Sequence, residues 1–293
     1  MRRRTFLLGA LSGLLPRAAG AEVLRPFAPG LHVLTTAYRP PSGATVDLTG
    51  VTLRHQNNTR AQTLIDLSFV DGVTIRGGTL DGNVGGQQTW NEFLMAIKVL
   101  SSTNVLIDGV TFQNLSGDGV YISYSYERTP KLAPRDVTVR GCRFLGDNRN
   151  RNGVSIIMGR DLEVVDCYFS RMARRGMPGA IDIEPDERDE VVSGVWIHGC
   201  TIEGPGPRGV TIANGTGPAQ ISDVRIENNT IDRQRTGIVL RGHQHSNESG
   251  VVVRYNTISK AKVGIEIGGL RASISKNAFR GCRDKFKRKD KRN

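Results

Sequence analysis

A two-strand phrase recurs along most of this 293-residue chain, at intervals of roughly 25 to 33 residues. Each copy has two stretches of alternating apolar and polar residues, separated by a small, Asn or Cys position, and then a Gly-Val/Ile-x-Ile segment or a close variant. The copies lie at 105–122, 137–156, 162–183, 195–212, 224–240 and 251–267. Alternation at period two is typical of strands, and no single copy could bury its apolar face alone. Stacked copies would bury a continuous core, which predicts a solenoid of parallel strands.

One column of the aligned copies holds small or amide residues. From copy to copy it reads Gly78, Val110, Cys142, Cys167, Cys200, Asn229, Asn256 and Asn277. Equivalent residues of stacked strands lie about 4.8 Å apart, so asparagines in such a column would hydrogen bond from rung to rung. Cysteines there would serve as small apolar fillers. Neighbouring cysteines would also be close enough for a disulfide, but we expect free buried thiols.

This pattern resembles the right-handed parallel β-helix of the pectate-lyase-like superfamily, which includes polygalacturonase-type glycosidases, polysaccharide lyases and phage tailspikes. The resemblance covers residues 45–280 and implies an all-β, single-stranded right-handed parallel β-helix. Residues 22–44, which contain four prolines, are expected to form an N-terminal cap. Such a coil needs a cap because its first rung exposes an unpaired edge and an open core.

The formal net charge of +12 is concentrated at the two ends of the chain. Four arginines within residues 1–21 and the Lys/Arg excess of residues 280–293 account for all but +2 of it. A nearly neutral body makes nucleic acid a poor candidate partner. Residues 281–293 are too charged to pack and are expected to be a disordered basic tail, with binding to an anionic polymer or lipid as the alternative.

The first 21 residues have the features of an export signal. Arg3-Arg4-Thr-Phe-Leu resembles the twin-arginine motif, an apolar stretch follows at 6–15, and Ala19-Gly20-Ala21 has the form of a cleavage site. The apolar stretch is short of the ~20 residues that span a bilayer, so stable membrane insertion is not expected. We therefore expect a periplasmic or secreted protein that leaves the cytoplasm by the twin-arginine route.

Three acidic residues are expected on one outward sheet face: Asp118, Asp182 and Glu184. Asp182 and Glu184 are two residues apart on a strand, so their stems would be ~6.5–7 Å apart. Inverting glycosidases hold two carboxyl groups ~6.5–9.5 Å apart, one protonating the leaving oxygen and the other activating water. Crowding of two carboxylates also raises one pKa, which would supply the acid. The leading hypothesis is therefore a glycoside hydrolase acting on a linear polysaccharide.

The segment Ser116-Gly-Asp-Gly-Val-Tyr-Ile122 resembles the N-T-D-G strand of polygalacturonase-type enzymes. That strand carries one catalytic aspartate, which the resemblance assigns to Asp118. The next rung has Asn152 where the family has an Asp-Asp pair, and no Gly-His-Gly or Arg-Ile-Lys motif occurs. Only Asp118 is therefore assigned a role from the resemblance.

Alternatives to hydrolysis remain open at this stage. Asp182 and Glu184 could be a solvated face paired with arginines of the 171–175 loop, or with Asp186 could bind Ca²⁺, whose preferred ligands are oxygens. A uronic-acid lyase or epimerase would need a cation or arginine to neutralise the substrate carboxylate, and Ca²⁺ would suit a lyase. A non-catalytic, glycan-binding surface protein is the third reading. For a hydrolase no cofactor or metal is expected.

Substrate contacts are expected from aromatic and basic residues near these acids. Aromatic rings can stack on sugars, and arginines can bind acidic groups. A loop with two histidines, at 242–247, adds a further candidate. The expected substrate-binding residues are Tyr121, Tyr124, Arg151, Arg175, Arg208 and His243.

Overall fold

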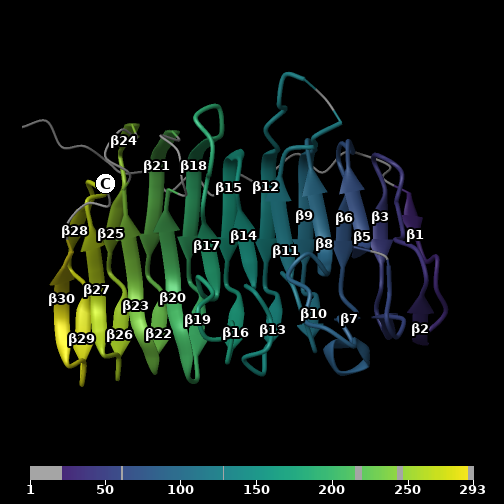
Figure 1. The fold of residues 1–293 in the computed structure, drawn as a ribbon. Helices are drawn as coiled ribbons and strands as arrows, with labels where there is room; N and C mark the ends of the chain where they lie inside the picture. The colour runs from purple at the N-terminus through teal and green to yellow at the C-terminus, as the bar shows by residue number, and fades with distance from the viewer. Residues whose placement is uncertain (1–21, 61, 128, 215–219, 243–246, 290–293) are drawn as a thin grey trace, which may run out of the picture.

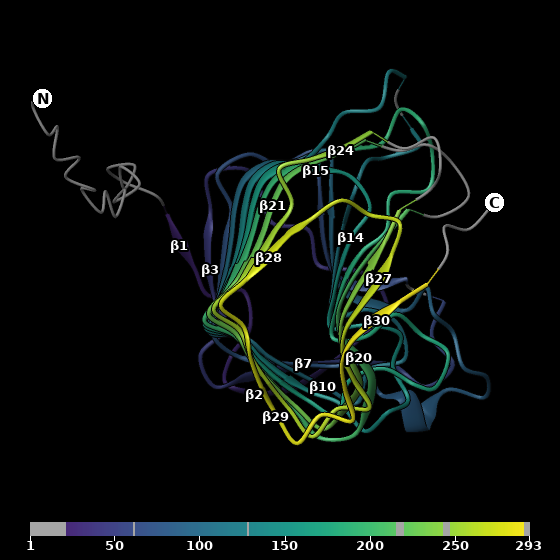
Figure 2. The same cartoon turned by 90° about the vertical axis from the view of Figure 1, so that its left-hand side faces the viewer.

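The computed structural model describes residues 22–60, 62–127, 129–214, 220–242 and 247–289. Their strands form three parallel sheets that run side by side along the length of the molecule (Figure 1). Viewed along the coil axis, the three sheets enclose a common core (Figure 2). The chain visits each sheet once per turn, so it winds as the predicted parallel β-helix.

Each sheet collects one strand from nearly every turn of the coil. Sheet A comprises β1 (Val23–Leu24), β3 (Thr45–Asp47), β6 (Thr74–Arg76), β9 (Thr103–Asp108), β12 (Arg135–Arg140), β15 (Gly159–Val165), β18 (Val191–His198), β21 (Gln220–Glu227), β24 (Asn247–Ser249), β25 (Val252–Arg254) and β28 (Ser273–Ser275). Sheet B comprises β2 (Gly30–Leu34), β4 (Val51–His55), β7 (Thr79–Asp81), β10 (Thr111–Gln113), β13 (Arg143–Leu145), β16 (Tyr168–Ser170), β19 (Thr201–Glu203), β22 (Thr230–Asp232), β26 (Thr257–Ser259) and β29 (Ala278–Arg280). Sheet C comprises β5 (Thr63–Ser68), β8 (Met95–Leu100), β11 (Val120–Ser123), β14 (Val154–Ile156), β17 (Ile181–Ile183), β20 (Gly206–Ala213), β23 (Gln234–Arg241), β27 (Val263–Gly268) and β30 (Asp284–Arg288). A single 3₁₀ turn, η1 (Val84–Gly86), precedes β8 among the described residues.

The Gly-Val/Ile-x-Ile segments all lie in sheet C, and their apolar residues stack in register. Val120 of β11 pairs with Val154 of β14, which in turn pairs with Ile181 of β17. Inside sheet B, the Phe144 ring stacks on Phe112 at 4.4 Å and on Phe169 at 4.6 Å, nearly parallel to both. The inward side chains of every rung therefore join one continuous core.

The corner between sheets A and B holds the predicted column of cysteines and asparagines. Cys142, Cys167 and Cys200 are buried and their thiols are free, as predicted. Further along, the Asn256 side-chain amide donates to the Asn277 side-chain oxygen at 2.9 Å, and the Asn229 amide donates to the Asn256 oxygen at 3.0 Å. The asparagines therefore form the predicted ladder, in which each side chain satisfies the next.

The boundaries of the coil differ from those predicted at both ends. Within the range 22–44, β1 pairs with β3 and β2 pairs with β4, so this segment already winds into sheets A and B. At the other end, β30 pairs with β27, so residues 284–288 are a strand and not a disordered tail. The prediction from charge did not take Phe286 into account. Its ring packs edge-on against Phe279 at 5.1 Å and holds this strand on the last turn.

The predicted export signal at 1–21 lies outside the described residues. Within the described part of the chain, no helix is long and apolar enough to cross a membrane.

The longer connections gather beside sheet C (Figure 2). In one of them, Lys131 contacts Asp189 at 2.8 Å, and its ammonium group also lies 4.3 Å from the Tyr124 ring. Two loops from different turns are thereby joined next to the outer face of sheet C.

Candidate functional site

The three predicted acids lie on sheet C, as expected from the alignment of the copies. Asp118 lies two residues before the start of β11, Asp182 is the central residue of β17, and Glu184 immediately follows β17. Since β14 separates β11 from β17, Asp118 stands two rungs before the other two. The predicted outward direction does not bring solvent exposure to all three: Asp118 and Asp182 have no exposed surface, whereas the Glu184 side chain is 29% exposed.

A single guanidinium group, that of Arg151, connects the acids. Its Nη1 donates to Asp118 Oδ2 at 2.9 Å, and its Nη2 donates to Glu184 Oε2 at 3.4 Å. Its Nε lies 3.4 Å from a carboxylate oxygen of Glu92, in the loop before β8. One cation therefore faces three carboxyl groups, with Asp182 as a fourth acid nearby.

Asn152 and Ser155 complete the network from β14 and the residues before it. The Asn152 backbone N–H donates to Asp118 Oδ1 at 3.0 Å, and its side-chain amide donates to Asp182 Oδ2 at 3.3 Å. The same amide donates to the Ser155 hydroxyl at 2.9 Å, which also accepts from Arg151. In contrast, Asp182 Oδ1 is buried and accepts no hydrogen bond.

The surroundings favour protonated carboxyl groups at the two buried positions. Burial raises the pKa of Asp118 to about 6, although the charge of Arg151 opposes the rise. Burial, and then the charge of Glu184, raise the pKa of Asp182 well above its usual value. For Arg151, burial would lower the pKa, but the charges of Asp118, Asp182 and Glu184 outweigh it and raise the pKa. Desolvation is therefore the leading cause for both buried aspartates.

The negative charge of Glu184 adds to the raised pKa of Asp182, so these two acids act on one another on the outer face of sheet C. Two carboxyl groups that share a proton keep one in the acid form at neutral pH. Glu184 is the member of the pair that solvent reaches, since Asp182 is fully buried.

The alternative partners foreseen for the acids are not found in the structure. Among the described residues, no carboxylate lies within ion-pair distance of Arg171, Arg174 or Arg175, and the guanidinium of Arg174 stacks over the Trp90 ring at 4.3 Å. Within the same part of the chain, no group of three or more His, Cys, Asp or Glu residues is placed to hold a metal ion. Arg151 takes the place expected for the loop arginines.

The two predicted substrate-binding tyrosines differ in their exposure to solvent. Tyr121 lies partly buried on the outer face of sheet C beside Asp118, and burial raises its pKa to about 12. Tyr124 is buried, its ring 4.7 Å from that of Tyr126, so it offers no free face to a sugar. Tyr126, in contrast, is 81% exposed. His243 lies outside the described residues.

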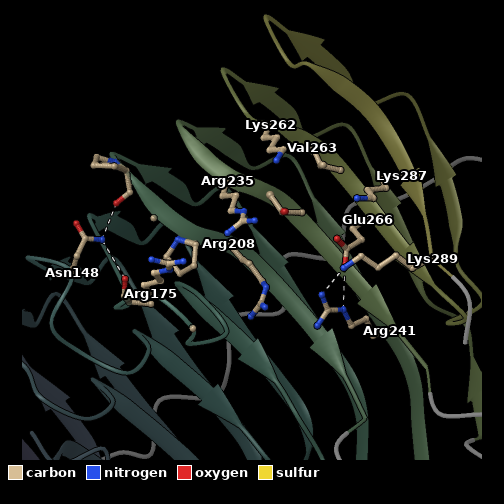
Figure 3. Close-up of a pocket in the computed structure, with 16 residues that line it drawn as sticks. Asn148, Arg175, Arg208, Arg235, Arg241, Lys262, Val263, Glu266, Lys287 and Lys289 are labelled. Carbon is tan, nitrogen blue, oxygen red and sulfur yellow. Dashed lines mark hydrogen bonds and ion pairs between the residues drawn. The ribbon is translucent and has the colours of Figure 1, made fainter. Parts of the chain in front are cut away.

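A basic pocket of about 580 Å³ lies beyond the acids on the later rungs of sheet C (Figure 3). The predicted Arg175 and Arg208 line it, together with five cations that were not singled out from the sequence. Those five are Arg235, Arg241, Lys262, Lys287 and Lys289. A signal for two of these five was present, because Arg235 and Lys262 follow the predicted Arg208 at 27-residue intervals, about one turn of the coil. Glu266 is the only acid among the described residues that line the pocket.

Arg208 joins the two regions. It lines the pocket, and its guanidinium donates to the Met177 carbonyl at 3.1 Å. Burial and the positive charge of Arg241 lower its pKa, while Asp182, Glu266 and Glu184 oppose this. The acid cluster and the basic pocket are thus adjacent parts of one outer face.

Comparison with known families gives one match, to the model described as a right-handed beta helix region, over residues 94–221. Among curated proteins, an uncharacterised SPbeta prophage-derived protein, YorA of Bacillus subtilis (strain 168), is 22% identical over 254 residues. That match covers 74% of this chain and 43% of the relative. The chain therefore spans less than half the length of this relative.

Three solved structures share the fold at low sequence identity. The tailspike of Escherichia coli bacteriophage HK620 has a TM-score of 0.61 at 16% identity, covering 92% of this chain and 53% of the tailspike. A family 28 exopolygalacturonase of Yersinia enterocolitica has a TM-score of 0.61 at 14% identity, with 87% and 59% covered. An endo-xylogalacturonan hydrolase of Aspergillus tubingensis has a TM-score of 0.60 at 14% identity, with 90% and 84% covered. The chain is a right-handed parallel β-helix that resembles polygalacturonases in its fold.

Proposed function

We propose that this protein is an exported, polysaccharide-active β-helix that hydrolyses glycosidic bonds. The observation that carries the proposal is the buried Asp182, whose Oδ1 accepts no hydrogen bond, beside the partly exposed Glu184. An oxygen with no donor nearby suits a carboxyl group that is itself protonated. A protonated carboxyl group next to an accessible carboxylate is the chemical pair that glycoside hydrolysis requires.

The names of the structural relatives support the same class of substrate. The exopolygalacturonase and the xylogalacturonan hydrolase act on polysaccharides by name, and a structure of the HK620 tailspike contains a hexasaccharide. All are below 25% identity to this chain, so their relevance to its chemistry is part of the proposal. A parallel β-helix offers a long outer face, which suits a linear polymer.

The proposed roles follow from burial and contact. Asp182 and Glu184 act as the acid and base pair, and Glu184 is the member that reaches the sugar. Protonation of the glycosidic oxygen by this pair assists departure of the leaving sugar, and the carboxylate then activates water. Asp118 holds Arg151 over the site, and Arg151 keeps Glu184 oriented.

A second candidate function, non-catalytic glycan binding, is favoured by the ion pairs of Arg151. Its guanidinium lies within 3.4 Å of carboxylate oxygens of Asp118, Glu184 and Glu92, and the Asp118 side chain has no exposed surface. Acids that serve only to balance a buried arginine would give the same contacts. Binding would then occur without turnover.

Product analysis separates these functions. The full chain would be incubated with a panel of acidic and neutral polysaccharides. New reducing ends without ultraviolet absorbance are expected for a hydrolase. An unsaturated product that absorbs in the ultraviolet would overturn hydrolysis in favour of a lyase, and glycan binding without any product would favour the binding protein.

Export by the twin-arginine route is a separate part of the proposal. It rests on Arg3 and Arg4 before the apolar stretch at 6–15. Changing Arg3→Lys and Arg4→Lys together is expected to leave unprocessed precursor in the cytoplasm, measured by fractionation and immunoblotting. Unchanged export of the double variant would assign the general secretory route instead.

A further inference from the structure

The basic pocket carries positive charge that the protein does not neutralise. Of the described cations that line the pocket, only Arg241 and Lys289 have a carboxylate partner. Both pair with Glu266, at 2.6 and 3.1 Å. Five further cations line the same cavity with no carboxylate of the described residues within ion-pair distance. These five are Arg175, Arg208, Arg235, Lys262 and Lys287.

Crowding of these cations acts most directly on Arg208, the least exposed of them. Burial and the charge of Arg241 lower its pKa, although Asp182 and Glu266 act in the other direction. Like charges held together at the rim of a cavity cost free energy in the unbound protein. An anionic ligand would remove that cost, since its own charge replaces the missing carboxylates.

The terminal strand builds one wall of this pocket (Figure 3). Lys287 of β30 stands in register with Glu266 of β27, and Lys289 follows the strand, its backbone N–H donating to the Ile267 carbonyl at 2.8 Å. Contact between the Phe286 and Phe279 rings holds the strand against the last turn. The basic C-terminal segment is therefore part of the outer face of sheet C.

We propose that this pocket binds the acidic groups of an anionic polysaccharide, and that β30 is a functional wall of the site. Arginine forks and lysine ammonium groups pair with both carboxylates and sulfate esters, which are the two anionic groups that a glycan can offer here. The choice of a glycan over other polyanions rests on the proposed function. The anion site itself rests on the geometry of the pocket alone.

The position of the pocket also orients the polymer. The acid cluster at Asp118, Asp182 and Glu184 repels anionic groups, whereas all cations of the pocket except Arg175 lie on the rungs after β17. An anionic chain therefore lies with its charged units on the later rungs. The glycosidic linkage to be cleaved, which carries no charge, then lies over Glu184.

Nucleic acid is the competing polyanion, and the lining argues against it. Single-stranded nucleic acid sites combine cations with aromatic side chains on which the bases stack. The described residues that line the pocket include no Phe, Tyr or Trp. A glycan needs no such platform when its acidic groups supply the affinity.

Binding of the full chain to polygalacturonate, dextran sulfate and neutral dextran tests the proposal. Isothermal titration calorimetry at low and high salt would be used, with a single-stranded oligonucleotide as a fourth probe. Tight, salt-sensitive binding to one or both anionic glycans is expected, and the better of the two identifies carboxylate or sulfate ester. Equal binding of neutral dextran, or preferred binding of the oligonucleotide through the same residues, would overturn the proposal.

Two pairs of variants isolate the pocket. Arg235→Gln with Lys262→Gln is expected to weaken anionic glycan binding by about 10- to 100-fold, the scale of two charge-assisted hydrogen bonds. Arg135→Gln with Arg271→Gln removes the same charge from exposed positions outside the pocket and should leave affinity unchanged. Equal losses in both double variants would show a general charge effect and refute the site.

Lys287→Gln tests the terminal strand without removing Phe286 or the backbone pairing of β30. A loss of anionic glycan affinity of roughly 5- to 10-fold is expected, with circular dichroism unchanged. Wild-type affinity in this variant would refute the role of β30. Binding that survives in Asp182→Asn, with no cleavage of any polysaccharide by the wild type, would refute the hydrolase proposal and leave the pocket proposal standing.

Discussion

The middle and late rungs of the coil share one backbone plan but differ in charge and in burial. On the middle rungs, β11 to β17, acidic side chains are buried beneath Arg151, and cysteines occupy the corner between sheets A and B. On the late rungs, β20 to β30, unpaired cations surround an open pocket, and an asparagine ladder occupies the same corner. A repeated backbone can therefore carry opposite electrostatics within a few turns.

The difference separates two tasks that a polymer-active protein must perform. Buried carboxyl groups have raised pKa values and can hold a proton, which suits chemistry. Unpaired cations near solvent gain most when an anionic ligand arrives, which suits binding. The comparison therefore assigns chemistry to the middle rungs and recognition to the late rungs.

Loss of a buried cation should be the most damaging change on the middle rungs. Arg151→Met leaves Asp118 and its neighbours without a partner, so we expect the free energy of unfolding to fall by about 3–5 kcal/mol. The matched late-rung change, Lys262→Met, removes a cation that has no carboxylate partner and should stay within about 0.5 kcal/mol. Urea denaturation of both variants measures this, and equal effects would break the comparison.

The pH dependence of stability should have opposite signs in the two regions. The pKa of Asp118 rises from 3.8 to about 6 on folding, so its stabilising contribution is full below pH 3.8 and is lost as pH rises toward 6. A shift of about two units corresponds to about 3 kcal/mol. Burial would raise the pKa of Glu266, but hydrogen bonds from Arg241 and Lys289 lower it, so its contribution is lost as pH falls.

Denaturation from pH 3 to pH 7 checks both signs, because the Glu266 contribution changes below pH 4.5 and the Asp118 contribution changes between pH 3.8 and about 6. Asp118→Asn should remove a decrease in stability that the wild type shows as pH rises. Glu266→Gln should remove an increase over the lower part of the same range. Parallel pH profiles for the two variants would mean that the regions do not differ in the way described.

Turnover should depend on the acid pair and binding on the cations. Asp182→Asn or Glu184→Gln is expected to lower kcat by at least ~10²-fold, the usual scale for a general acid or base. Stability should hold or rise in these variants, because a contact between two acids is relieved. Lys262→Gln should raise KM and leave kcat close to that of the wild type. Intact turnover with reduced stability in the acid variants would show that the acids are structural.

The smallest expected effects on stability are at the column of cysteines and asparagines between sheets A and B. Asn256→Ala removes hydrogen bonds to Asn277 and to the Ile226 carbonyl and should cost about 1–3 kcal/mol, since buried groups lose their partners. Cys167→Ala removes one sulfur atom from a similar place and should cost roughly 1 kcal/mol. Thermal unfolding measures both, and a larger loss for the cysteine variant would contradict the ladder's role.

The sequence predicted the winding of the coil because the constraint is periodic. Val120, Val154 and Ile181 had to stack once the Gly-Val/Ile-x-Ile segments were aligned, and the Asn256 column followed from the same alignment. The two-rung separation of Asp118 from Asp182 came with it. Strand alternation fixes which side chains share a face, and it does so without knowledge of loops.

Burial at the site could not be predicted in this way. Alternation placed Asp118 and Asp182 on the outer face, but it does not predict the ion pairs of Arg151, which lies in the variable connection of the copy at 137–156, or of Glu92, which lies in a loop outside the copies. The full burial of Asp182 beside a partly exposed Glu184 depends on side-chain rotamers, which strand spacing does not set. The strand β30 was missed because net charge was weighed above the single apolar residue, Phe286, that anchors it.

The stacking of sheet C also fixes the distances between sites on its outer face. From β17 to β30 the chain takes four steps, through β20, β23 and β27, each of about 4.8 Å. The distance between the acid cluster and the terminal wall is therefore set in whole rungs, at about 19 Å. In a relative with one repeat copy more or fewer between these strands, the two sites would contact a longer or shorter stretch of polymer, with every local contact unchanged.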